Sequence, residues 1–296
     1  IILFGDGFMS LMVDNMPFWL KKRNNIEPLN PSRLHKSYHL FSVSNKPIKY
    51  KSEKMNPEFD LYFWPTPNGY KVAIMLEELE AKYRLVPINI TKGEQHQEQF
   101  RRISPNHKIP ALTHFREGEH APVHLFESGA ILLYLGDWAK KLVPVDPKDY
   151  RDCLMWLMWQ MASLGPMAGQ AHHFLRYAPE DVPYAKKRYL NECQRLYGVL
   201  ENRLGESKFV AGEYSIADIA ILAWVYRHER HEIDLAKFPG VSAWYQSLLE
   251  RPSVRKGFAL GDEFSGQCIL DLRLIGSLFA FQLQETHIAC PDGLCC

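Results

Sequence analysis

A polar turn, FWPTPNGYK at residues 63–71, separates a β-rich segment from a segment with helical periodicity. The turn contains no Cys, His, Asp or Glu, so it supplies no strong nucleophile of its own. The Thr66 hydroxyl and the Asn68 amide are hydrogen-bond donors, and donors at a helix N-terminus stabilise an anion. A thiolate is one such anion, because this setting lowers the pKa of a thiol. We therefore expect the turn to activate a sulfur nucleophile that arrives with a ligand.

Two other segments favour an anionic, peptide-like ligand. In KIP, Pro110 lies just before a predicted strand, which suits a cis-prolyl turn that exposes the backbone of Ile109 to an extended peptide. In ES, Ser128 opens a predicted helix whose free N–H groups favour a carboxylate. An ordinary loop proline and a simple helix N-cap remain the structural alternatives, and Ser128 can both cap the helix and bind a ligand.

Other chemically suggestive residues favour structural interpretations. His172 and His173 are adjacent, so their rings point to different faces of a helix, and the sequence offers no obvious third metal ligand. The segment RHERHE (227–232) is not an HExxH motif and is predicted to form a solvated helix face. Ser215 and Asp218 resemble a helix capping box. Core and interface positions, rather than a cofactor site, are predicted for Met155, Trp156, Met158 and Trp159.

The elements that must position these residues form two blocks. The first block has the order βαβ followed by ββα, with strands predicted near 59–64, 83–90, 108–115 and 122–126 and its last helix over 127–141. After the Pro- and Asp-rich segment VPVDPKDY, strand signals end and amphipathic or buried helices follow. The expected fold class is therefore α/β plus all-α, with a mixed-sheet domain followed by a helical domain.

The domain boundaries follow from the same patterns. We expect the first domain over 56–141, a linker over 142–147 and the all-helical domain over 148–261. The flanking segments 1–55 and 262–296 lack clear periodicity and are predicted to be a poorly ordered extension and tail.

Composition excludes several classes of protein. A net charge of +1 gives no electrostatic signature for nucleic acid. The apolar N-terminal stretch carries Asp6 and Asp14 and lacks a basic leader region, so a signal peptide or membrane anchor is not expected. The six cysteines are widely spread and none forms a CxxC pair, which argues against a disulfide framework and favours the cytoplasm.

The chain resembles the nu class of the glutathione transferase superfamily, which comprises bacterial glutathione-dependent disulfide-bond oxidoreductases and their fungal relatives. Six segments carry the resemblance in order: PTPNGYK, ISPNHKIPAL, LFESGAILLYL, LGPMAGQAHHF, PYAKKRY and YSIADIA. It extends from about Phe59 to Phe258 and implies a thioredoxin-like first domain, a homodimer, and glutathione as co-substrate without a metal. Common glutathione transferases place Tyr, Ser or Cys at the activating turn. This turn departs from all three, as the nu class does.

The resemblance also implies roles for individual residues. Thr66 and Asn68 take the catalytic positions beside the glutathione sulfur. The backbone of Ile109 beside Pro110 holds the cysteinyl part of glutathione. The remaining ligand contacts that the resemblance implies come from Gln95, Lys108, Glu127 and Ser128, of which the last two hold the γ-glutamyl end.

Three residues of the second block complete the expected site. Arg188 matches a position that reaches the ligand from the partner subunit of the homodimer. Gln170 and His173 follow the first long helix, where the family builds part of its pocket for the second ligand.

Energetics favour thiol–disulfide exchange as the reaction. A free thiol with a pKa of about 8.5 is roughly 3% thiolate at neutral pH, and lowering the pKa by about two units gives about 25-fold more thiolate. Because nucleophilicity falls with pKa, the net gain is only about threefold. Holding a second sulfur in line with the attacking thiolate contributes far more to the reaction rate. We therefore expect reduction of small disulfides by two glutathiones, with weaker transferase or peroxidase activity. The alternatives are a detoxifying transferase that conjugates electrophiles and a non-catalytic glutathione-binding regulator.

Overall fold

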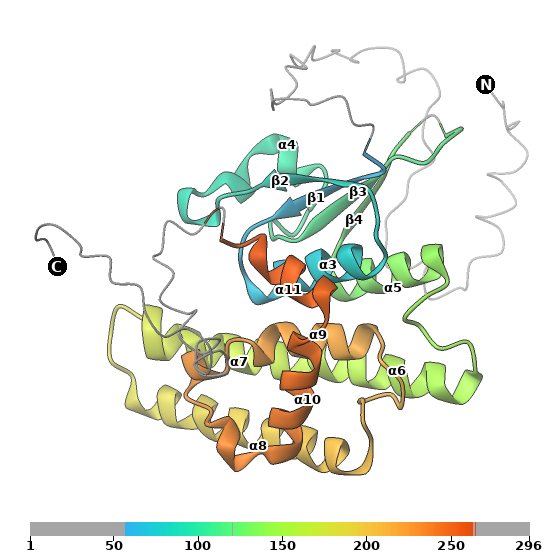
Figure 1. Cartoon of the computed structure of the whole chain (residues 1–296). Coiled ribbons are helices and arrows are strands. Elements are labelled where there is room, and N and C mark those ends of the chain that lie inside the picture. The colour runs from blue at the N-terminus through green and yellow to red at the C-terminus, as the bar shows by residue number, and fades with distance from the viewer. Residues whose placement is uncertain (1–56, 120, 263, 265–296) are drawn as a thin grey trace, which may run out of the picture. The chain divides into compact units, whose positions relative to one another are not determined.

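The computed structural model describes residues 57–119, 121–262 and 264 (Figure 1). All of them belong to one compact unit, Lys54–Cys296. The predictions for residues 1–55, and for the tail apart from Asp262 and Phe264, lie outside the described residues.

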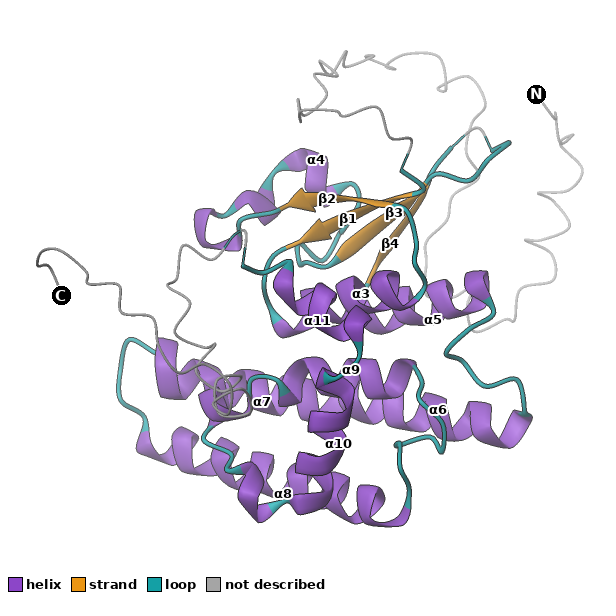
Figure 2. Cartoon of the chain, viewed as in Figure 1, coloured by secondary structure: helices purple, strands orange, loops and turns teal. Residues whose placement is uncertain are grey.

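A four-stranded mixed sheet forms the first part of this unit (Figure 2). Its strands are β1 (Phe59–Phe63), β2 (Tyr83–Pro87), β3 (Ala111–His114) and β4 (Val123–Phe126), in the spatial order β2-β1-β3-β4. β1 pairs with β2 in parallel and with β3 antiparallel, and β3 pairs with β4 antiparallel. The expected order of elements and the thioredoxin-like architecture are confirmed. β2 ends before the predicted 90, because Asn89 caps a short 3₁₀ helix, η2 (Ile90–Lys92).

Helices cover both faces of the sheet. α3 (Pro67–Glu78) and α5 (Ser128–Ala139) belong to the main core with Phe59, Leu61 and Phe63 of β1. The alternate residue Tyr62 instead contacts the ring of Phe100 in α4 (Glu98–Arg101) and joins a second, smaller core. Successive side chains of a strand point to opposite faces, so α3 and α5 lie on one face of the sheet and α4 on the other. A second 3₁₀ helix, η3 (Glu94–His96), precedes α4.

The second part is helical, as predicted. The first long helix is α6 (Pro147–Trp159), which passes through the π-helical turn η4 (Gln160–Leu164) into α7 (Gly165–His172) and a second π-helical turn, η5 (His173–Tyr177). Then follow α8 (Pro183–Glu206), α9 (Ile216–Val225), η6 (His228–His231), η7 (Leu235–Lys237), α10 (Pro239–Leu249) and α11 (Pro252–Ala259).

Every residue of α9 is buried, which places this helix at the centre of the helical part. The predicted capping box is confirmed: the Ser215 hydroxyl accepts a hydrogen bond at the first turn, and the Asp218 carboxylate accepts one from the backbone N–H of Ser215. Asp218 also accepts hydrogen bonds from the Val210 backbone and the Trp244 indole, so its buried carboxylate is fully engaged.

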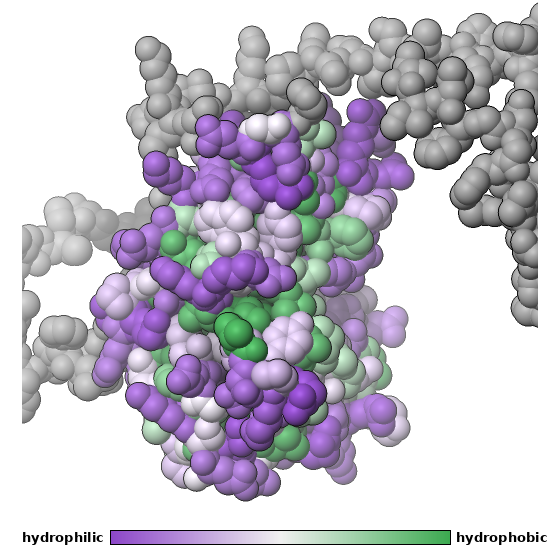
Figure 3. All heavy atoms as spheres, turned by 90° about the vertical axis from the view of Figure 1, so that its right-hand side faces the viewer, coloured by the Kyte–Doolittle hydropathy of each residue, from purple (hydrophilic) through white to green (hydrophobic). Residues whose placement is uncertain are grey.

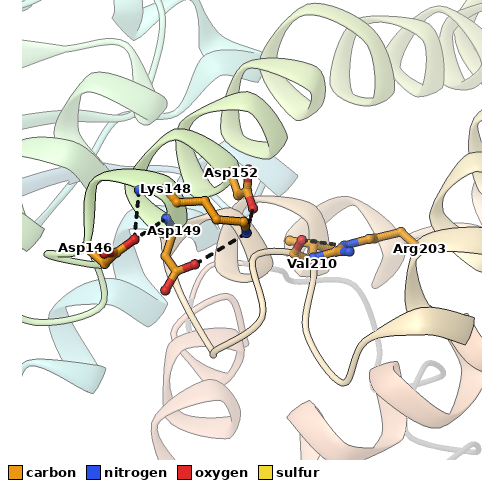
Figure 4. A network of polar contacts seen from close by, with 6 residues as sticks. All are labelled: Asp146, Lys148, Asp149, Asp152, Arg203 and Val210. Atoms are coloured by element: carbon orange, nitrogen blue, oxygen red, sulfur yellow. Dashed lines mark hydrogen bonds and ion pairs between the residues drawn. The ribbon is translucent and has the colours of Figure 1, made fainter.

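Polar contacts determine where α6 begins (Figure 4). Asp146 caps the helix by accepting hydrogen bonds from the backbone N–H groups of Lys148 and Asp149. The Lys148 ammonium forms an ion pair with Asp152, one turn further on, at 2.9 Å. α6 therefore starts at Pro147, the last residue of the predicted linker.

The two parts of the unit are closely joined. α11 packs against α3, where a Cβ at Gly257 would lie only 2.8 Å from the Ile74 Cα, so these helices approach at backbone distance. The Arg251 guanidinium forms two hydrogen bonds of 2.7 Å with the Glu78 carboxylate at the end of α3. These contacts pair elements about 180 residues apart, which sequence periodicity does not reveal.

The prediction for RHERHE was wrong at one position. His231 is completely buried, because both its ring nitrogens are hydrogen-bonded, one to His172 and the other to the Tyr197 hydroxyl. A histidine whose nitrogens are both satisfied can be buried at little cost.

Candidate functional site

The polar turn lies between β1 and α3, as predicted. Thr66 is the N-cap of α3, and its Oγ accepts a hydrogen bond of 3.2 Å from the Gly69 backbone N–H. Since a hydroxyl can accept and donate at once, the Thr66 proton remains available for an anion at the helix N-terminus. Gly69 is needed here, because a Cβ would lie 2.4 Å from the Trp64 carbonyl oxygen.

Asn68 does not cap α3, because its side-chain oxygen is bonded elsewhere. Its Oδ1 accepts a hydrogen bond of 3.1 Å from the Trp224 indole N–H at the end of α9. The cap is Thr66, two residues earlier, so the Asn68 side chain is half-buried between the two parts of the unit.

The start of α5 provides a second helix N-terminus. Glu127 precedes the helix with φ 69° and ψ 110°, a conformation that is strained for a residue with a side chain. Its carboxylate is exposed and accepts a hydrogen bond from the Asn106 amide. Ser128 is buried at the first helical position. Strain of this kind is common where backbone groups are held in place for a ligand.

Lys71, which sequence analysis missed, joins the two helix N-termini. Its side chain is 1% exposed, and its ammonium donates hydrogen bonds to Ser128 Oγ at 3.3 Å and to Gln160 Oε1 at 2.6 Å. Burial lowers the pKa of the Lys71 ammonium to about 7, and the Glu127 carboxylate partly opposes this shift. A lysine in the apolar stripe of a helix, directly before Val72 and Ala73, was the available signal.

Gln160 also belongs to this region. It is completely buried at the start of the π-helical turn η4, and its Nε2 has no hydrogen-bond partner among the described residues. Lys71 thus places a buried ammonium beside Ser128, and the Gln160 amide retains two protons without a partner among the described residues.

The loop before β3 carries the expected cis peptide bond. The Ile109–Pro110 bond is cis, which confirms the prediction, and both residues are buried. The Ser104 hydroxyl donates a hydrogen bond of 2.8 Å to the carbonyl of Lys108, the residue before Ile109. The Lys108 side chain itself is exposed.

The other predicted ligand contacts come from separate elements. Gln95 lies in η3, and its side-chain oxygen is buried without a hydrogen-bond partner among the described residues. Gln170 and His173 are exposed at the end of α7 and the start of η5. Arg188 is exposed on α8.

The described residues include no candidate metal-binding site. No group of three or more His, Cys, Asp or Glu side chains among them could hold a metal ion. No helix within the described ranges has the length and apolar character to cross a membrane.

Cys153 and Cys193 are buried free thiols, and burial raises the pKa of each.

Both parts of the described chain are similar to known proteins. The family models named glutathione S-transferase N-terminal domain and C-terminal domain match residues 57–137 and 161–252. Disulfide-bond oxidoreductase YfcG of Escherichia coli K12 is 47% identical over 211 residues, which cover 70% of this chain and 98% of that protein.

Solved structures with bound ligands are similar as well. A glutathione transferase of Pseudomonas putida, with one glutathione disulfide bound per subunit, matches at 39% identity and a TM-score of 0.66, over 70% of this chain and 93% of that one. A family member from Pseudomonas fluorescens, with two glutathiones bound, matches at 36% identity and a TM-score of 0.65, over 70% of this chain and 94% of that one.

Proposed function

Because the chain belongs to the glutathione S-transferase family, we propose that it reduces small disulfides, with glutathione supplying the thiolate. The observation that carries this proposal is a helix N-terminus with donors but no thiol. Thr66 retains a free hydroxyl proton there, while Cys153 and Cys193 are buried and have raised pKa values. The disulfide-bond oxidoreductase of E. coli and the glutathione complexes of the Pseudomonas proteins support the same reaction.

The proposed reaction uses two glutathiones. The first thiolate attacks one sulfur of the substrate disulfide, which forms a mixed disulfide and releases one substrate thiolate that takes up a proton. The second glutathione thiolate attacks the glutathione sulfur of the mixed disulfide and releases the other substrate thiol. Two thiols are oxidised to one glutathione disulfide while one disulfide is reduced to two thiols, so electrons and protons balance.

The Thr66 hydroxyl and the Asn68 amide stabilise the attacking thiolate at the N-terminus of α3. The γ-glutamyl carboxylate binds at the N-terminus of α5, next to the Ser128 hydroxyl and the first backbone N–H groups. Glu127 accepts the γ-glutamyl ammonium.

The remaining contacts hold the rest of the ligand. The backbone of Ile109, presented by the cis bond to Pro110, pairs with the cysteinyl part of glutathione. Gln95 and Lys108 bind its polar groups. Gln170 and His173 line the pocket of the second ligand.

A homodimer completes this site, with Arg188 reaching the ligand of the partner subunit. Apolar side chains support a docking surface: Met155 and Met158 are 60% and 45% exposed on α6. Hydrophobic side chains also gather near the middle of the face that Figure 3 shows. Exposed apolar patches of this kind favour association between proteins. The proposed location is the cytoplasm, where glutathione is kept reduced and buried cysteines stay free.

A coupled assay with purified protein tests the proposal. Steady-state reduction of a small symmetrical disulfide by glutathione is measured beside conjugation of an aromatic halide, with the Thr66→Val variant as the matched control. We expect disulfide reduction to dominate and to fall at least tenfold in Thr66→Val. Faster conjugation than disulfide reduction would indicate a detoxifying transferase. Glutathione binding without either activity would indicate a regulator.

A further inference from the structure

The hydrogen bond between Trp224 and Asn68 determines which way the Asn68 amide faces. An indole N–H can only donate, so the group that faces Trp224 must be the acceptor, Oδ1. The Asn68 NH₂ group therefore faces away from Trp224. Without this partner, the oxygen and the NH₂ group could exchange by rotation of the side chain, and the oxygen would repel a thiolate.

The Trp224 indole is itself held on one side by α7. It is 7% exposed and lies over two glycines. A Cβ at Gly165 would lie 3.2 Å from the indole Nε1, and a Cβ at Gly169 would lie 3.3 Å from the far edge of the ring. The glycines let the indole lie close to the helix backbone, which limits its movement.

A buried histidine pair, of which His172 lies at the end of α7, also contacts the indole. The His172 ring lies 5.8 Å from the Trp224 ring, tilted by 33°. His172 Nε2 is 2.7 Å from Nδ1 of His231, whose Nε2 is 2.9 Å from the Tyr197 hydroxyl. All of these groups are buried.

The protons of this pair can be assigned from its partners. His172 also hydrogen-bonds the backbone of Arg227. The Arg227 N–H donates to the carbonyl of Trp224, so His172 Nδ1–H donates to the Arg227 carbonyl. His172 Nε2 is then an acceptor from His231 Nδ1–H, and His231 Nε2 accepts from the Tyr197 hydroxyl. Both rings are neutral and every ring nitrogen is satisfied, which makes the support rigid.

We propose that Trp224 is a positioning residue for the sulfur chemistry: its indole N–H orients the Asn68 amide so that the NH₂ group donates to the glutathione thiolate. This inference rests on the proposed function, and it adds a residue of α9 to the donors at the N-terminus of α3. Removing a residue that orients a ligand-contacting side chain commonly lowers activity tenfold or more.

Trp224→Phe tests the proposal, because it keeps an aromatic ring and removes only the N–H and part of the ring. We expect turnover in disulfide reduction to fall about tenfold and the thiol pKa of bound glutathione, followed by thiolate absorbance in the binary complex, to rise by about half a unit or more. Adding Trp224→Phe to Asn68→Ala should cause no further loss, since Trp224 acts through Asn68. A wild-type thiol pKa and turnover in folded Trp224→Phe would overturn the proposal, and so would additive losses.

Trp244→Phe is the matched control. It removes an indole N–H that donates to Asp218 at 3.0 Å, in the same helical part but away from Asn68. We expect it to lower stability and to leave the thiol pKa unchanged, and an equal rise in both variants would contradict a specific role for Trp224.

Asn68→Asp is a second test if Trp224→Phe does not fold. Its carboxylate keeps an acceptor for Trp224 but directs a negative oxygen at the sulfur, so the thiol pKa should rise further than in Asn68→Ala. A thiol pKa no higher than that of Asn68→Ala would also overturn the assigned orientation. The thiol pKa is read from the binary complex with glutathione. It therefore tests Trp224 even if the wild-type protein reduces no disulfide, an outcome that would reject the proposed function alone.

Discussion

Lys71 Nζ lies 3.3 Å from Ser128 Oγ, so a buried ammonium from the second turn of α3 contacts the hydroxyl of the first residue of α5. The Lys71 side chain is buried. Besides Ser128 Oγ, its ammonium donates to one other oxygen, which belongs to the uncharged amide of Gln160. Burial without a directly bound anion lowers the pKa of Lys71 to about 7. An anion bound at Ser128 would supply the missing charge.

Ligand binding is therefore expected to be coupled to proton uptake. At pH 8 Lys71 is mostly neutral, and a carboxylate at Ser128 would raise its pKa and protonate it. Binding of S-methylglutathione, which has no thiol to titrate, should take up a fraction of a proton at pH 8. The measurement is calorimetric titration in two buffers with different ionisation enthalpies. In Lys71→Met the uptake should vanish, and an unchanged uptake would exclude Lys71 as its source.

The same residue should make stability depend on pH. Its folded pKa of about 7 lies below its unfolded value of about 10.4, so the unfolded state binds more protons between these values and stability rises with pH across that window. Relative to Lys71→Met, the wild-type free energy of unfolding should gain on the order of 2 kcal/mol between pH 7 and pH 9. Denaturant titrations at both pH values measure this, and a difference that is constant with pH would contradict a lowered pKa.

Thr66 should contribute to both stability and rate. Thr66→Ala removes the N-cap of α3 and should cost about 1 kcal/mol of unfolding free energy. It also removes the hydroxyl donor, so turnover should fall at least tenfold, since a hydrogen bond to a charged group is worth about 1.5–3 kcal/mol. Thr66→Ser, which keeps the hydroxyl, should retain most of the unfolding free energy and most of the turnover. A variant that loses stability but keeps its rate would leave Thr66 with a capping role alone.

Protein cysteines should be dispensable for disulfide reduction. Cys153 and Cys193 are buried and have raised pKa values, which makes both poor nucleophiles. With all six cysteines replaced by Ala, turnover should stay within about threefold of wild type if glutathione supplies both sulfurs. Circular dichroism confirms that the variant is folded. A folded variant that binds glutathione but is inactive would point to a protein thiol as the resolving nucleophile.

A shortened chain should retain the site if it keeps Phe264. The Phe264 ring lies 6.3 Å from the Phe63 ring and 6.1 Å from the Trp64 ring, next to the active turn. We expect a protein spanning 56–264 to fold as a dimer with wild-type glutathione affinity. A protein ending at Gly261 should melt at a lower temperature, because it loses these ring contacts. Loss of binding in the longer protein would show that a flanking segment belongs to the functional unit.

Local patterns were sufficient to predict the elements of the fold. The buried run FDLYF, the helical spacing after the turn and the Ser215–Asp218 capping box all depend on residues close in sequence, and each is confirmed. Pro110 likewise carries its cis bond next to the strand it precedes. Thr66 and Asn68 were recognisable because Thr and Asn are typical of the polar turn that begins a helix, and because the resemblance implies catalytic roles for both.

What surrounds that turn was decided only by tertiary structure. Gln160 lies 89 residues from its partner Lys71, and Trp224 lies 156 residues from its partner Asn68, and nothing in the local sequence shows that these residues meet. His231 was assigned to a solvated face because its own segment is charged, yet its partners His172 and Tyr197 lie on other helices. The sequence thus determined the donors at the turn, since helix capping is local. Only packing of the helical part against α3 decided how the Asn68 amide is oriented and how far the pKa of Lys71 is lowered, because burial and long-range hydrogen bonds depend on the whole fold.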